Sequence, residues 1–153
     1  MQAQEQIQNV DINRPEANFT FEINDVQPLL DSRKSRGSEF FFCRSIRFYV
    51  IAQNVYFEGG EYFGVYLSVH NPSDTYYYSM ATSYEFRLVN WNGKEDKIEK
   101  FNFNFGDGRS SNHGNTKFLP ISMLTSPSGG WVKNDKLQLK VNLKCGNLFR
   151  NRS

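Results

Sequence analysis

Catalysis depends on side chains that act in pairs, and this sequence offers few of them. It contains only two histidines, His70 and His113, and neither lies in a motif that pairs it with an activated serine or cysteine. No glycine-rich loop leads into a helix, as a phosphate site requires, and Asp107 has the pattern of a turn residue. We therefore expect no catalytic residue, no metal ligands and no cofactor in this chain.

The two cysteines, Cys43 and Cys145, are far apart in the sequence. No histidine or further cysteine is spaced around them as in a zinc site. Because disulfides are rare in the cytosol and nucleus, we expect two free thiols, with a disulfide as the alternative.

Composition narrows the class of partner. The formal charge of +2 is the small difference between 18 basic and 16 acidic residues, and no dense basic run is interleaved with aromatic residues, so nucleic acid is not an expected partner. Residues 1–8 lack the basic and apolar regions of a signal peptide, and no stretch approaches the ~18 apolar residues of a membrane span. We expect a soluble, non-secreted protein of the nucleus or cytoplasm, without membrane contact.

The apolar residues recur with a period of two, which indicates strands. Residues 1–16 are rich in Gln and Asn and are expected to be a flexible leader, and the Pro- and Ser-containing segment 25–37 is expected to be a loop. No amphipathic helix is predicted. The expected strands are residues 19–23, 39–44, 46–53, 62–70, 79–91, 98–105, 115–119 and 137–143. This spacing predicts an all-β fold, an antiparallel β-sandwich of seven to eight strands over residues 17–145, with a tail at 146–153.

Three stretches carry a resemblance to a known family. They are the Phe-rich opening at 19–23, the tract Asn112-His113-Gly114 ahead of Phe118, and the polar turn after Gly130 that leads into alternating residues 137–143. Over residues 19–143 the chain resembles a MATH domain, the meprin and TRAF homology fold. Residues 44–91 look most like the N-terminal substrate-recognition domain of the herpesvirus-associated ubiquitin-specific protease family. The resemblance implies a module that binds extended peptides and catalyses nothing.

The resemblance also implies where a peptide binds. In the family a short peptide pairs with an exposed strand that carries an Asp-Trp-Gly-aromatic motif, and its side chains enter small pockets. The matching residues are Asn112, His113, Gly114 and Asn115. Three of the four depart from the motif, which argues against the family's usual serine-containing ligand. Gly114 is kept, and its bare backbone would permit a ligand strand to approach closely.

Further contacts are expected outside this motif. Arg44 matches an arginine that the deubiquitinase family uses on its peptide, with a solvated strand end as the alternative. Tyr66, Tyr84 and either Phe103 or Phe105 are expected to wall the site, although an aromatic residue on a sandwich strand is more often part of the core. The run of tyrosines at 76–78 is a second candidate contact surface.

The expected function is recruitment of partner or substrate proteins through short linear peptide motifs, as the substrate-recruiting domain of a deubiquitinase whose catalytic part lies elsewhere. Two alternatives are a POZ-linked ubiquitin-ligase adaptor and a trimeric TRAF-type signalling adaptor. No heptad run precedes residue 19, so we expect the chain to be a monomer.

Overall fold

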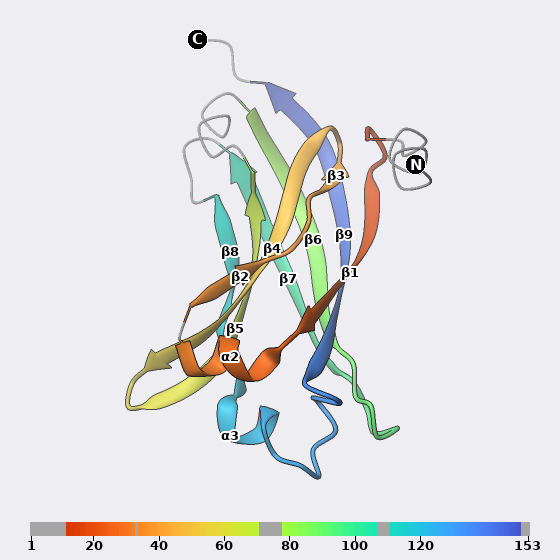
Figure 1. Cartoon of the computed structure of the whole chain (residues 1–153). Helices are drawn as coiled ribbons and strands as arrows, with labels where there is room; N and C mark the ends of the chain where they lie inside the picture. Colours follow the sequence, from red (N-terminus) through yellow and green to blue (C-terminus); the bar gives the residue numbers. More distant parts are fainter. Residues whose placement is uncertain (1–11, 33, 71–77, 107–110, 151–153) are drawn as a thin grey trace.

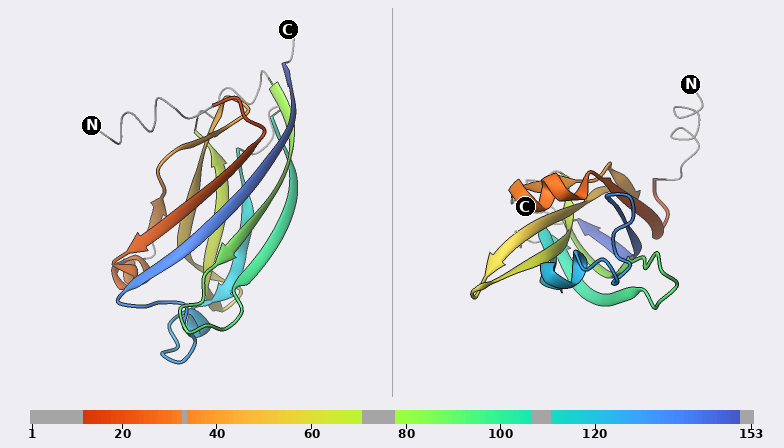
Figure 2. Two further views of the ribbon diagram at one scale, coloured as in Figure 1. Left: turned by 90° about the vertical axis from the view of Figure 1, so that its right-hand side faces the viewer. Right: turned by 60° about the horizontal axis from the view of Figure 1, so that its bottom comes forward.

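The computed structural model describes residues 12–32, 34–70, 78–106 and 111–150, which fold into two antiparallel sheets lying face to face (Figures 1 and 2). Sheet A has the order β1 (Glu16–Asn24), β9 (Lys136–Arg150), β6 (Tyr78–Leu88) and β7 (Lys97–Gly106). Sheet B has the order β2 (Ser35–Gly37), β4 (Ile46–Phe57), β5 (Gly60–Val69) and β8 (Asn112–Pro120), and β3 (Phe41–Cys43) also pairs with β4. The predicted antiparallel sandwich is confirmed, with nine strands in the described part of the chain.

The core between the sheets follows from the alternation in the sequence. On β5, Phe63, Val65 and Leu67 are fully buried while Tyr62 and Tyr66 are only half-buried. Successive side chains of a strand point to opposite faces, so one apolar row fills the interior and the other residues face outward. Burying a side chain of this size contributes about 1.5–3 kcal/mol, which makes this shared interior the main source of stability.

Two short helices differ from the prediction that the chain has none. Helix α2 (Val26–Ser32) occupies part of the expected loop, and α3 (Ile121–Leu124) follows β8 at the same end of the sandwich (Figure 1). In α2 the buried residues Val26, Leu29 and Leu30 have the i, i+3, i+4 spacing of one helical face. Seven residues are too few for that spacing to stand out in the sequence, which is why the loop prediction was wrong.

Both ends of the expected domain are more ordered than the sequence indicates. The carbonyls of Ile12, Arg14 and Pro15 accept backbone hydrogen bonds of 2.7, 2.9 and 2.7 Å from Ser45, Arg44 and Cys145. Strand β9 continues to Arg150, through the segment predicted as a tail. Residues 1–11 and 151–153 lie outside the described ranges.

The two cysteines, which come from different sheets, are neighbours in the interior and are both free thiols. A hydrogen bond between the thiols lowers the pKa of Cys43. The same bond, together with burial, raises the pKa of Cys145.

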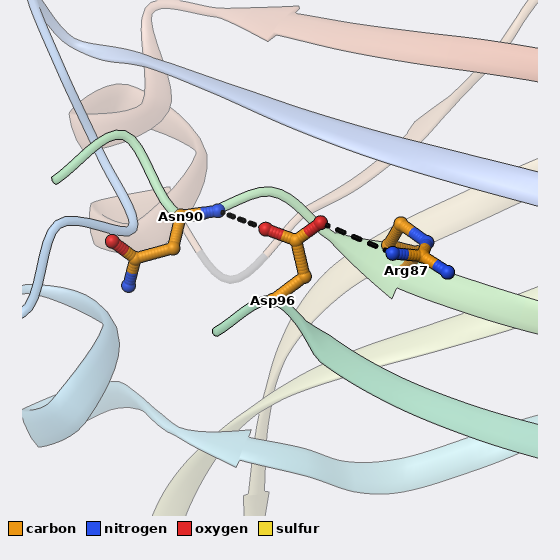
Figure 3. Close-up of polar contacts among 3 residues, drawn as sticks. All are labelled: Arg87, Asn90 and Asp96. Carbon is orange, nitrogen blue, oxygen red and sulfur yellow. Dashed lines mark hydrogen bonds and ion pairs between the residues drawn. The ribbon is translucent and has the colours of Figure 1, made fainter. Parts of the chain in front are cut away.

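The end of the β6–β7 hairpin is held by one carboxylate (Figure 3). Asp96 accepts a hydrogen bond of 2.9 Å from the backbone N–H of Asn90 and forms an ion pair of 3.4 Å with Arg87. These contacts fix β7 against β6, in the register that pairs Phe101 with Tyr84. Because a slip of one residue would turn every side chain of β7 to the other face, this clamp helps to keep the register in which β7 directs Phe101 inward.

Candidate functional site

Strand β8 ends sheet B. It pairs with β5 on one side, and on its other side no strand lies among the residues that the structure describes. The pairing runs from Ser68 with Asn112 to Val65 with Asn115, shifts at a bulge, and resumes where Phe63 pairs with Leu119. An edge strand of this kind presents backbone N–H and C=O groups to which an extended segment can pair.

Gly114 explains how β8 lies so close to β5. A Cβ atom at this position would lie 2.0 Å from the carbonyl oxygen of Val65 and 2.7 Å from the Cα of Tyr66. Both atoms belong to the backbone and cannot move aside cheaply. The space that the missing side chain leaves is therefore filled by β5 of the same chain, whereas the sequence suggested that a ligand strand would use it.

His113 joins the edge of sheet B to the edge of sheet A. Its ring stacks on Phe103 of β7, with centroids 4.1 Å apart and planes inclined by 16°, and meets Phe101 edge-on at 5.8 Å. We call the side chains that connect the two edges, namely Glu99, Phe101, Phe103, His113 and Asn115, the β7–β8 seam. The seam forms a half-buried, largely aromatic floor beside the free edge of β8.

The buried hydroxyl of Tyr84 fixes the imidazole of His113. It lies 2.6 Å from Nδ1 and 3.0 Å from the carbonyl oxygen of the same residue. A hydroxyl has one proton to donate, so both contacts are satisfied when it donates to the carbonyl and accepts from Nδ1–H. Burial lowers the pKa of His113, which favours the neutral ring. In this tautomer Nε2 is an acceptor, and it has no hydrogen-bond partner within the described ranges.

Asn115 makes the second link across the seam. Its Nδ2 donates a hydrogen bond of 2.7 Å to Oε1 of Glu99, and its Oδ1 accepts one of 2.9 Å from the backbone N–H of Lys117. The side chain of Asn115 is thus held on the same face of β8 as His113. Glu99 gives this part of the seam a negative charge.

The opposite face of β8 carries Asn112, which is exposed, and Thr116, whose hydroxyl lies 2.9 Å from that of Tyr66. The sequence placed Tyr66 opposite the apolar row of its strand, and the structure has it there, half-buried on the outer face of sheet B. Tyr66 and the seam therefore flank β8 from its two faces.

Two of the aromatic residues predicted to wall the site are core residues. Phe105 is 0% exposed and packs edge-on against Phe48 and Phe103, so the prediction that it contacts a peptide was wrong. Tyr84 is only 3% exposed and supports His113 from beneath. Both residues lie deeper than Phe103. The sequence could not predict this, because alternation reveals which face of a sheet a residue occupies and not how far it lies from the sheet edge.

Arg44 is not brought together with the β8 residues. It lies in the turn after β3, where its Nε–H donates a hydrogen bond of 3.4 Å to the carbonyl of Cys145. Strands β4 and β5 separate β3 from β8, a distance of about 14 Å at the usual strand spacing. Tyr76 and Tyr77, together with the side chain of Tyr78, lie outside what the structure describes, so the second candidate contact surface stays a prediction.

Sequence reasoning missed Phe101 and Glu99 as members of the site. The sequence gives only a weak signal for these two residues. Both lie on the inward face of a strand whose alternation of inward and outward residues is ordinary. Only the packing of the two sheets brings them into contact with β8. Nothing in the described ranges groups three side chains that could hold a metal ion, and none of the helices there is long and apolar enough to cross a membrane.

The Tyr84 hydroxyl is expected to stabilise the seam. In Tyr84→Phe the Nδ1–H and the carbonyl of His113 lose their partner, so we expect the free energy of unfolding to fall by about 1–2 kcal/mol. Urea denaturation measures the change. Tyr49→Phe is the matched control, because the Tyr49 hydroxyl makes no hydrogen bond within the described ranges and its removal should change stability by less than about 0.5 kcal/mol. Equal effects of the two substitutions would contradict the role given to Tyr84.

Comparison with known proteins identifies a family. A family model described as a MATH domain matches residues 18–143. No curated protein matches the chain. Among solved structures, a family 11 carbohydrate-binding module from Clostridium thermocellum, in complex with a mixed-linked tetrasaccharide, is 11% identical over 93% of this chain and 90% of that chain. Its TM-score of 0.17 is too low to support any argument about fold or ligand.

Proposed function

This chain belongs to the MATH domain family, whose members are protein-interaction modules without catalytic activity of their own, and we propose that it binds short extended peptide segments of partner proteins by strand addition to β8. The observation that carries the proposal is the free edge of β8 beside the β7–β8 seam. Backbone pairing would supply affinity, and the seam on one face and Tyr66 on the other would supply selectivity.

The residues proposed to contact the peptide are Asn112, His113, Asn115 and Tyr66, with Phe103 in place of Phe105. Gly114 acts indirectly, because it sets the position of β8 against β5. Such an interface is small, so we expect a dissociation constant in the micromolar range, about −7 to −8 kcal/mol of binding free energy.

Strand addition has a test that does not depend on side chains. Peptides selected from a random display library on the purified chain would be resynthesised with single backbone N-methyl groups at successive positions. Alternate residues of an added strand turn their N–H toward the neighbouring strand, so methylation should abolish binding at every second position and leave it nearly unchanged at the others. Calorimetric titration measures each peptide. Uniform sensitivity, or none, would contradict strand addition, and failure to select any peptide would contradict peptide binding itself.

We also propose that the domain recruits substrates to a deubiquitinase in the nucleus or cytoplasm and acts as a monomer. The support is the likeness of residues 44–91 to the recognition domain of the herpesvirus-associated protease family. The full-length protein should then cleave a ubiquitin-fluorophore substrate while the isolated chain does not. An inactive full-length protein would remove the support for this role and leave peptide binding intact.

A further inference from the structure

The carboxylate of Glu99 is only partly satisfied. Its Oε1 accepts the hydrogen bond from Asn115, but its Oε2 has neither a hydrogen bond nor an ion pair in the part of the chain that the structure describes. The side chain is half-buried beside the free edge of β8. A carboxylate has room for about four donors, so this one can accept more than the single bond it receives.

Two described cations near Glu99, Lys97 and Lys117, are directed elsewhere. Lys97 lies on the same face of β7, yet its ammonium group sits over the ring of Phe118 at 5.7 Å. Lys117, two residues beyond Asn115, pairs with Glu58 at 2.8 Å. The negative charge of Glu99 also acts on Tyr84 beneath the seam. After burial, it is the second cause that raises the pKa of Tyr84. Within the described residues, the seam therefore carries a negative charge that no ion pair compensates.

Two side-chain acceptors at this edge have no hydrogen-bond donor within the described residues. They are Oε2 of Glu99 and Nε2 of His113, whose Nδ1–H is committed to Tyr84. A ligand that complements such a site must bring donors. Residues directly opposite each other on paired strands point to the same face, so a peptide residue paired with Asn115 would direct its side chain toward Glu99. The peptide residue paired with His113, two positions away, would face the rings of Phe101 and Phe103.

We infer that the peptide segment recognised at β8 carries a lysine or arginine in the position paired with Asn115, bound by Glu99, and an apolar residue two positions away, packed on the ring of His113. The inference rests on the proposed strand addition and specifies its substrate class. An arginine fits best, since its guanidinium can donate to both Glu99 Oε2 and a neighbouring acceptor.

Display selection with a random library of extended peptides tests this on the intact chain and on Glu99→Gln. Glutamine keeps the acceptor for Asn115 and has the same shape, so the fold is expected to persist. On the original chain, selected peptides should be enriched in a basic residue two positions from an apolar one, and on Glu99→Gln the basic preference should vanish. For a selected peptide, Glu99→Gln should weaken binding by about tenfold, the scale of a lost charge-assisted bond.

Glu85→Gln is the matched control. Glu85 is half-buried on the neighbouring strand β6 and lines a hollow on the outer face of sheet A, so its substitution should leave affinity unchanged. A charge exchange completes the test: Glu99→Lys should lose the basic peptide and bind a version in which the basic residue is glutamate. Selected peptides without a basic preference, or equal effects of the two glutamine variants, would overturn the inference while strand addition stands. Selection of no peptide at all would overturn both.

Discussion

Gly114→Ala is expected to be strongly destabilising, with a loss of about 3 kcal/mol or more in the free energy of unfolding, because overpacking against rigid atoms exceeds the usual cost of an added methyl group. The new Cβ would lie 2.0 Å from the carbonyl oxygen of Val65 and 2.9 Å from its carbonyl carbon, both in the backbone of β5. Relief requires β8 to separate from β5. The same displacement should abolish peptide binding, since it moves the edge to which the peptide would pair.

Gly37→Ala separates this steric effect from the general effect of replacing glycine in a strand. Gly37 lies in β2 of the same sheet, and its added Cβ would be 3.7 Å from the ring of Tyr49, an ordinary contact. Its substitution should be neutral or stabilise by up to about 1 kcal/mol, because alanine restricts the unfolded chain. Urea denaturation of both variants measures the difference. If the two unfold at the same urea concentration, β8 and β5 are not packed as described.

Asn90→Ala should have the second largest effect, a loss of about 2–4 kcal/mol, since it removes two hydrogen bonds of a side chain that is 8% exposed. The Nδ2 of Asn90 donates to the carbonyl of Gly129 at 2.8 Å, and its Oδ1 accepts from the backbone N–H of Asn92 at 2.9 Å. Next to it, the N–H of Trp91 donates to the carbonyl of Gly130 at 2.6 Å. Asn90 thus ties the end of the β6–β7 hairpin to the loop ahead of β9.

Two further variants resolve what Asn90 contributes. Asn90→Asp keeps the acceptor for Asn92 and loses the donor to Gly129, so it should fall between the original chain and the alanine variant. Asn92→Ala removes only a 3.5 Å contact of an exposed side chain and should change stability by less than about 0.5 kcal/mol. Thermal unfolding followed by circular dichroism ranks the three. An Asn92 variant as unstable as the Asn90 variant would show that the loop is held in another way.

Replacing Asn90 is also expected to affect the proposed peptide site. Its backbone N–H is the group that Asp96 holds, and this contact fixes where β7 begins (Figure 3). Glu99, Phe101 and Phe103 follow from that point at intervals of two residues, all facing inward. A hairpin end that is loosened should therefore weaken peptide binding even though Asn90 touches no part of β8.

The sequence by itself determined the class of fold and the composition of its core. Alternation with a period of two, interrupted by turn residues, is a local property, and it predicts strands and inward faces without knowledge of partners. That is why the antiparallel sandwich, the inward row of β5 and the outward position of Tyr66 were predictable. The family was predictable as well, because its motifs extend over nearly the whole chain, and the match of residues 18–143 to the MATH domain model confirms it.

Only the tertiary structure decided which residues stand together at the edge. Phe103 and Phe105 share one face of β7, and the position of β8 alone makes the first a neighbour of His113 and the second a core residue. Arg44 was expected to contact the same peptide as Asn112 but lies beyond two intervening strands, since strand order in a sheet is not a property of any single strand. Glu99 and Asn115 meet from different sheets. Contacts of this kind join residues that are far apart in the sequence. The alternation within a single strand cannot reveal which other strand will lie beside it.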